Sequence, residues 1–274
     1  MNPTTTSGLR RCWQTLCALL LAAGLAACGA PQSSPDPLAA VAQRGPQVES
    51  TLGTQWGEGR ESVTYDVEAT RLHPEHAQAL SQLRYSDEAS IRRALGGSAD
   101  RQLNVLLADG AVEWSLLDGQ GQALPVYSQR GSSSYQLAGR HGERYMLVFT
   151  NRSSRNYEVV ATVDGLDVLS GQAGSLQNAG YLLRAGQTLH IEGFRKNSRE
   201  VAAFRFATKD RAYAAHTADG DARNIGVIGA ALFEVQLAGN PVAQPPRSGA
   251  GAPAPQAFPG DAGRGGYAQP PQYR

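Results

Sequence analysis

The sequence predicts a mainly β protein, an antiparallel, jelly-roll-like β-sandwich that carries one or two short helices. Between residues 144 and 234, short runs of alternating apolar and polar residues follow one another with glycine or asparagine between them. This period of two is typical of strands that bury one face. Turn signals separate the runs at intervals of about 8 to 12 residues, which is the spacing found in sandwiches and barrels.

Two segments before residue 86 show different periods. Residues 62–70 (SVTYDVEAT) place Val63, Tyr65 and Val67 on one face, so we expect a strand with that face buried. In residues 74–84 the period changes, and we expect a helix that begins at a proline. The apolar residues at helical spacing in this segment are Ala77, Leu80 and Leu83.

A second short helix is predicted over residues 86–96. Ser86 is the expected N-cap and Gly96 the expected stop. Acidic residues stand in the first turn and basic residues in the last, which matches the helix dipole at both ends. These charged residues are Asp87, Glu88, Arg92 and Arg93.

From residue 103 onward the pattern indicates strands alone. Two hairpin turn signals separate these strands: Asp109-Gly110 and the run DGQG at 118–121. Aspartate and glycine tolerate the positive φ that such turns require. We therefore expect the first three of these strands to form a meander. The predicted strands are 103–107, 112–117, 122–127, 144–151, 157–163, 166–169, 181–183, 188–192, 201–206 and 227–236.

The N-terminus has the layout of a secretory signal. Residues 1–11 carry two arginines and no acid, and residues 13–24 (WQTLCALLLAAG) are almost wholly apolar but short for a membrane span. The next four residues, Leu25 to Cys28, resemble the lipobox of bacterial lipoproteins. The resemblance implies cleavage between Ala27 and Cys28 and attachment of lipid to the Cys28 side chain.

Two other interpretations fit this N-terminus less well. One is an uncleaved membrane helix that happens to contain a cysteine, which the short apolar run disfavours. The other is twin-arginine export through Arg10 and Arg11, which the surrounding positions do not fit. Glycine rather than aspartate at position 29 implies, by the same resemblance, transfer to the outer membrane, where acyl chains would hold the protein.

The composition divides the chain into four parts. We expect residues 1–27 to be the signal peptide and residues 28–50, rich in proline, serine and alanine, to be a flexible linker. Residues 51–237 form the expected sandwich domain. Residues 238–274 hold eight of the fifteen prolines and are expected to be a disordered tail.

Charge and cysteine content exclude some functions. Without Arg10 and Arg11, 23 basic residues stand against 24 acidic ones, so no basic surface for nucleic acid is expected. Cleavage would also remove Cys12 and Cys17, and Cys28 would be lipidated. The mature chain would then have no disulfide and no thiol catalyst. No cofactor is implied.

Three groups of polar residues are candidates for a site. His73 and His76 flank Glu75, but two ligands do not make a zinc site, so no metal is expected. His190 and Glu192 share a strand face, which also describes an ordinary exposed face of a sandwich. Asp164 and Asp167 bracket Gly165, and a turn explains them more simply than a pair of catalytic carboxylates.

The remaining candidates are aromatic residues and one loop. Trp56 lies beside Gly57 and Gly59, which would let a backbone or a ligand come close, and exposed aromatics can stack on sugars. Trp114, Phe194 and Tyr213 are further aromatic candidates for such a platform. Residues 193–199 are predicted to form a polar, basic loop that contacts an anionic partner. The predicted contact residues are Trp56, Phe194, Arg195, Lys196 and Arg199.

Several motifs resemble an uncharacterised family of bacterial secreted proteins and lipoproteins. They are TQWGE (54–58), VDGLDVLSG (163–171), GYLL (180–183), IEGFRKN (191–197), VAAFRF (201–206), YAA (213–215) and RNIGVIGAALF (223–233). The resemblance covers about a third of the chain. It implies no activity and no catalytic residues.

Together these features predict a lipoprotein anchored in the outer membrane through Cys28, on its periplasmic or surface-exposed side. Its sandwich is expected to be a non-enzymatic binding or envelope-structural module. The alternative is a protein that binds or hydrolyses envelope glycans. The partners expected are the membrane, and an envelope glycan or another envelope protein.

Overall fold

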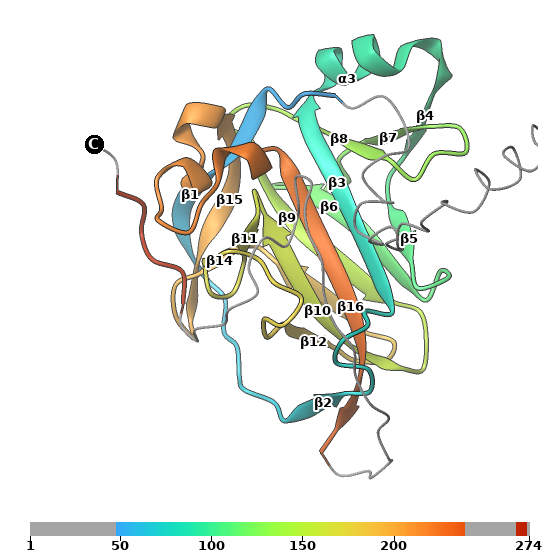
Figure 1. Cartoon of the computed structure of the whole chain (residues 1–274), viewed down its shortest axis with the longest axis vertical. Coiled ribbons are helices and arrows are strands. Elements are labelled where there is room, and N and C mark those ends of the chain that lie inside the picture. Colours follow the sequence, from blue (N-terminus) through green and yellow to red (C-terminus); the bar gives the residue numbers. More distant parts are fainter. Residues whose placement is uncertain (1–47, 239–266, 273–274) are drawn as a thin grey trace, which may run out of the picture. The chain divides into compact units, whose positions relative to one another are not determined.

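The protein is a β-sandwich of two large, mostly antiparallel sheets, as the sequence predicts (Figure 1). This computed structural model describes residues 48–238 and 267–272. The predicted signal peptide, Cys28, most of the predicted linker and most of the predicted tail lie outside the described residues. All strands of the sandwich fall between Leu52 and Leu237.

The first sheet has the order β1-β15-β9-β6-β5, with β13 beside β9 and β14 beside β15. Every pairing in it is antiparallel. Its strands are β1 (Leu52–Glu61), β5 (Val105–Leu107), β6 (Val112–Asp118), β9 (Arg144–Asn151), β13 (Thr188–Ile191), β14 (Gly193–Arg195) and β15 (Glu200–Thr208).

The second sheet has the order β11-β10-β16-β3-β8-β7-β4, with β12 beside β10 and β2 beside β16. Within it β3 and β8 run parallel. Its strands are β2 (Ala69–Arg71), β3 (Ala79–Asp87), β4 (Ala99–Gln102), β7 (Val126–Gln129), β8 (Tyr135–Gly139), β10 (Asn156–Val163), β11 (Leu166–Asp167), β12 (Tyr181–Leu183) and β16 (Val227–Leu237).

The helix predicted after residue 86 is confirmed as α3 (Glu88–Leu95). Its N-cap is Asp87 rather than Ser86, because the Asp87 carboxylate accepts from the Ser90 backbone N–H at 2.8 Å. Gly96 ends the helix with φ +61°. Short 3₁₀ turns are η1 (Gly96–Ser98), η2 (Lys209–Arg211), η3 (Tyr213–Ala215) and η4 (Ala222–Asn224).

The helix predicted over residues 74–84 is wrong, since strand β3 begins at Ala79. Leu83 faces the core between the sheets, while Leu80 packs on the outer side against a separate apolar cluster that includes Phe233. Apolar residues on both faces of a central strand imitate helical spacing. Pairing with β16 and β8 decides the structure here.

The strand predicted over residues 62–70 is also wrong. Residues 62–68 form no strand, and Val63, Tyr65 and Val67 are 50%, 86% and 47% exposed. The real strand, β1, ends just before them at Glu61. Two main-chain bonds, Ser62 to Arg199 and Thr64 to Ser198, extend the pairing before the segment leaves the sheet.

The predicted meander is corrected in its third strand. Strands β5 and β6 pair as a hairpin, but β7 pairs with β4 and β8 in the other sheet. The chain makes one bridge from Ala123 to Leu117 and then reaches Pro125, which has no N–H to donate to a ladder. The predicted strands from residue 144 onward are all confirmed within a few residues.

Parts of the predicted linker and tail are packed on the sandwich. Val48 is 5% exposed and belongs to a cluster with Ile91 and Leu95 of α3. Ala268 is 3% exposed and belongs to the main core cluster. Flexibility is therefore the wrong description for residues 48–50 and 267–272.

Candidate functional site

The predicted aromatic platform lies in the core. Trp114, Phe194 and Tyr213 are each at most 1% exposed. Trp56 is half-buried, and its ring stacks at 6.3 Å from Phe194 and lies 4.9 Å from Tyr213. Gly57 beside it admits a neighbouring backbone, because a Cβ there would lie 2.4 Å from the Ala203 carbonyl oxygen. These rings stabilise the packing of β1 and cannot form a sugar-binding face.

The predicted basic loop at 193–199 is buried in its first half. Gly193, Phe194 and Arg195 form β14, which pairs with β15. Gly193 permits this close pairing, since a Cβ there would lie 2.0 Å from the Ala202 carbonyl oxygen. Phe194 and Arg195 are therefore not surface contacts, and this part of the prediction is wrong.

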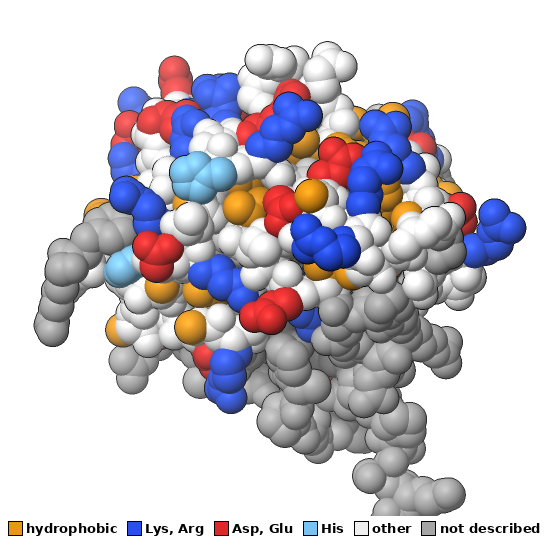
Figure 2. Space-filling model, turned by 90° about the horizontal axis from the view of Figure 1, so that it is seen from above, with side chains coloured by type: hydrophobic (Ala, Val, Ile, Leu, Met, Phe, Trp, Pro, Cys, Tyr) orange, Lys and Arg blue, Asp and Glu red, His pale blue; other side chains and the backbone are white. Residues whose placement is uncertain are grey.

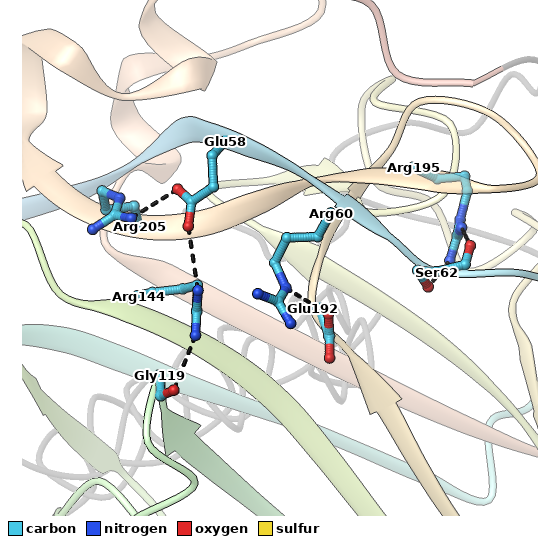
Figure 3. Close-up of polar contacts among 8 residues, drawn as sticks. All are labelled: Glu58, Arg60, Ser62, Gly119, Arg144, Glu192, Arg195 and Arg205. Carbon is cyan, nitrogen blue, oxygen red and sulfur yellow. Dashed lines mark hydrogen bonds and ion pairs between the residues drawn. The ribbon is translucent and has the colours of Figure 1, made fainter.

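Arg195 instead holds the segment that follows β1 (Figure 3). Arg195 is only 3% exposed. Its guanidinium donates to the Ser62 carbonyl oxygen and, at 3.0 Å, to the Ser62 hydroxyl. It also donates to the Tyr181 hydroxyl at 3.2 Å. The guanidinium thus fixes the point at which residues 62–68 leave the sheet.

The second half of the predicted loop stays at the surface. Lys196 pairs with Glu200 at 3.0 Å, and Arg199 is exposed. Arg199 and its neighbour Ser198 help to line an open hollow of about 460 Å³. The other lining residues are Glu61, Val63, Thr64, Tyr65, Asp66 and Tyr267.

This hollow, which we call the tyrosine hollow, has two exposed aromatic rings. Tyr65 is 86% exposed and Tyr267 is 43% exposed. Around them stand one guanidinium, two carboxylates and two hydroxyls, from Arg199, Glu61, Asp66, Thr64 and Ser198. Aromatic faces with a few polar donors and acceptors suit a ligand that has both hydroxyl groups and apolar C–H faces.

Sequence reasoning missed Tyr65 as a site residue. The alternation of Val63, Tyr65 and Val67 predicts the buried face of a strand. The missing signal was the end of pairing at Glu61, which depends on β15, more than 130 residues away. A pattern of period two cannot distinguish a paired strand from an extended segment that projects into solvent.

An ion-pair network covers the outer face of β1 and its neighbours (Figure 3). Glu58 accepts from Arg205 at 2.7 Å and from Arg144 at 3.4 Å, and the Arg205 hydrogen bond lowers the pKa of Glu58 to about 2. Glu192 pairs with Arg60 at 2.9 Å, and His190 is exposed. The Glu192 carboxylate is thus held in an ion pair with Arg60.

Charges of opposite sign also alternate elsewhere on the surface. Figure 2 shows basic and acidic side chains interspersed over the face it presents. Exposed pairs of this kind contribute about 0 to 1 kcal/mol each. We therefore do not place the functional site in these networks.

Asp164 and Asp167 are both about 1% exposed. Asp164 has φ +54° and Gly165 φ +77°, which confirms the predicted turn. Asp167 caps its own turn by accepting from the backbone N–H groups of Leu169 and Ser170 at 3.1 and 2.7 Å. Neither carboxylate is available to a substrate, so the alternative of catalysis by this pair is wrong.

The Asp164 carboxylate ties the two sheets together. It accepts from the Thr54 N–H at 2.8 Å, the Gly226 N–H at 2.8 Å and the Tyr85 hydroxyl at 2.6 Å. The Thr54 hydroxyl lies 2.8 Å from the Tyr85 hydroxyl and 2.6 Å from that of Tyr145. Burial raises the pKa of Asp164 from 3.8 to about 6, against the lowering effect of these hydrogen bonds.

Within residues 48–238 and 267–272, no three His, Cys, Asp or Glu side chains gather as metal ligands. Among the same described residues, no helix has the length and apolar content needed to cross a membrane.

Comparisons of the chain with protein-family models, with curated proteins and with solved structures find no match. The resemblance to a family of bacterial lipoproteins therefore stays a prediction.

Proposed function

We propose that this chain is a lipoprotein anchored in the bacterial outer membrane through Cys28, whose β-sandwich is a non-enzymatic binding module. The proposed membrane anchoring is supported by the short apolar run of residues 13–24 and by the four residues that end at Cys28. The binding role is supported by a hollow with exposed aromatic and charged side chains on the sandwich.

The ligand class that best fits the tyrosine hollow is an envelope glycan. The observation that carries this proposal is that Tyr65 and Tyr267 stand exposed around one hollow together with Arg199. Sugar rings present C–H groups that stack on aromatic faces, and their hydroxyl or acidic substituents accept from a guanidinium. The hollow replaces the predicted platform at Trp56 and Trp114 as the sugar-binding candidate.

Removal of the Tyr65 ring is expected to weaken glycan binding about fivefold, since aromatic stacking is worth on the order of 1 kcal/mol. Isothermal titration of the mature protein with soluble peptidoglycan and lipopolysaccharide fragments measures this effect in Tyr65→Ala. Tyr65→Phe should retain most of the affinity. Leu106→Ala, which truncates a side chain 60% exposed on β5, is the matched control. Equal affinity in Tyr65→Ala and the wild type would refute the assignment of the site.

Glycan hydrolysis remains the rival function, because Glu61 and Asp66 both line the hollow. Under the proposal, incubation with the same fragments releases no reducing ends. Turnover by the wild type that disappears in Glu61→Gln or Asp66→Asn would make the protein a glycosidase and overturn the non-enzymatic assignment.

The Cys28→Ser variant tests the anchor. We expect it to lose acyl labelling and to appear in the soluble envelope fraction, since without the thiol no lipid can be attached. Fractionation of cells grown with a labelled fatty acid measures both properties. If Cys28→Ser stays in the membrane, an uncleaved N-terminal helix is the anchor instead.

A further inference from the structure

The tail segment, residues 267–272 (YAQPPQ), runs along the sandwich beside β14 and η3 (Figure 1, red), at a site that we call the tail groove. The Ala268 N–H donates to the Arg195 carbonyl oxygen at 2.8 Å, at an edge of β14. The Tyr213 hydroxyl of η3 donates to the Gln269 carbonyl oxygen at 2.6 Å. The Gln272 N–H donates to the His216 carbonyl oxygen at 3.1 Å. Backbone groups of the segment therefore make the polar contacts.

The space around position 268 of the tail segment limits the size of the side chain there. Ala268 is 3% exposed and lies against Gly171, where an added Cβ would come within 2.6 Å of the Ala268 Cβ. A larger side chain at position 268 would collide with this turn. By contrast, Tyr267 is 43% exposed, and Gln269, Pro270 and Gln272 are exposed too, so little restriction falls on these side chains.

The two prolines fix the backbone between these anchors. Pro270 and Pro271 favour the extended polyproline II conformation, which is already populated before binding and so costs little entropy on docking. They separate the bond at Gln269 from the bond at Gln272. The groove thus recognises a small residue followed, two and three positions later, by a pair of prolines.

The sequence Ala-Gln-Pro-Pro of residues 268–271 occurs a second time in the chain, at residues 243–246. Residues 242–247 read VAQPPR, and residues 267–272 read YAQPPQ. The two copies are identical at the buried alanine, the following glutamine and the proline pair. They differ at the first and last positions, which are exposed in the docked copy, as are Gln269 and Pro270. Both copies therefore carry the small residue that the contact with Gly171 requires and the proline pair that favours an extended backbone, as expected for two ligands of one site.

We propose that the tail groove is a peptide-binding site for Ala-Gln-Pro-Pro segments, and that residues 242–247 are its second ligand in this chain. Residues 267–272 are the resident ligand, held in cis and displaceable. Residues 239–266 separate the resident segment from the sandwich, so the segment competes at an effective concentration in about the millimolar range. This inference does not depend on the proposed glycan site.

Fluorescence anisotropy with two labelled hexapeptides, YAQPPQ and VAQPPR, tests the proposal on the mature protein. In the double variant Ala243→Leu, Ala268→Leu neither segment of the chain should occupy the groove, and both peptides should bind at least about tenfold more tightly than to the wild type. A chain that ends at Gly266 and carries Ala243→Leu should behave in the same way, because it lacks both ligands. Ala243→Leu, which changes the other motif, should bind like the wild type.

Specificity for the groove is checked with Tyr213→Phe on the Ala243→Leu, Ala268→Leu background. Loss of the hydroxyl that bonds to Gln269 should weaken both peptides by about fivefold. The proposal is overturned if neither opened protein binds the peptides, if only YAQPPQ binds, or if a scrambled peptide binds equally well.

Discussion

Asp164→Ala is expected to lower the free energy of unfolding by on the order of 3 to 5 kcal/mol. The substitution leaves two backbone N–H groups, of Thr54 and Gly226, and the Tyr85 hydroxyl without their acceptor in the interior. The removed carboxylate also joins the two sheets, since Thr54 lies on β1 and Tyr85 on β3. Urea denaturation followed by circular dichroism measures the change.

The matched control is Asp219→Ala, which removes an exposed carboxylate. We expect that variant to stay within about 0.5 kcal/mol of the wild type. A loss in Asp164→Ala no larger than that of the control would show that the buried carboxylate does not hold the sheets together.

Mild acid is expected to stabilise the fold through the same group. The pKa of Asp164 is about 6 in the folded protein and 3.8 ordinarily, so between these values the folded state binds a proton that the unfolded state does not. Stability therefore rises as the pH falls from about 6 to about 4, and falls as the pH rises through 6. A difference of roughly two pH units corresponds to about 3 kcal/mol over the whole window.

Denaturation at pH 7 and pH 5 isolates this effect when the wild type is compared with Asp164→Asn. The wild type should gain about 1 kcal/mol at pH 5 relative to the variant, because asparagine does not titrate. Glu58 and Asp87, whose pKa values are about 2, lose their contributions only at lower pH. The same pH dependence in both proteins would refute the raised pKa of Asp164.

Much of the sandwich is predictable from the sequence, for physical reasons that can be named. The strands from Arg144 to Leu237 alternate apolar and polar residues or are apolar throughout, and glycine or asparagine turns separate them. Strand β1 was missed because Gly53 and Gly57 interrupt its pattern. Both glycines are required by close packing, since a Cβ at Gly53 would lie 2.6 Å from the Ala212 Cβ.

The site was less predictable than the fold. Arg195 and Lys196 are adjacent in a basic run, yet one is buried under residue 62 and the other is at the surface. Which residue is buried depends on the pairing of β14 with β15 and on the course of residues 62–68. Arg199 was correctly expected at the surface, whereas Tyr65 was expected in the core. These outcomes depend on contacts between segments far apart in sequence, which local patterns do not specify.

The docked tail segment illustrates the same point. Proline and glycine content predicts disorder for the whole tail, and composition cannot reveal that a six-residue segment fits an edge of β14. The complementary feature is on the sandwich, at Gly171 and Tyr213. The duplicated Ala-Gln-Pro-Pro motif is visible in the sequence, but a binding role for it can be inferred only from the contacts of the docked copy.

The most direct test of the proposed function is photocrosslinking in living cells with a photoreactive phenylalanine analogue in place of Tyr65. The same analogue in place of Leu106, on another exposed strand, is the control. We predict an adduct at position 65 that glycan-degrading enzymes shift to lower mass and that Arg199→Ala reduces. No adduct at position 65 above that at position 106 would contradict the proposal that the tyrosine hollow binds an envelope glycan.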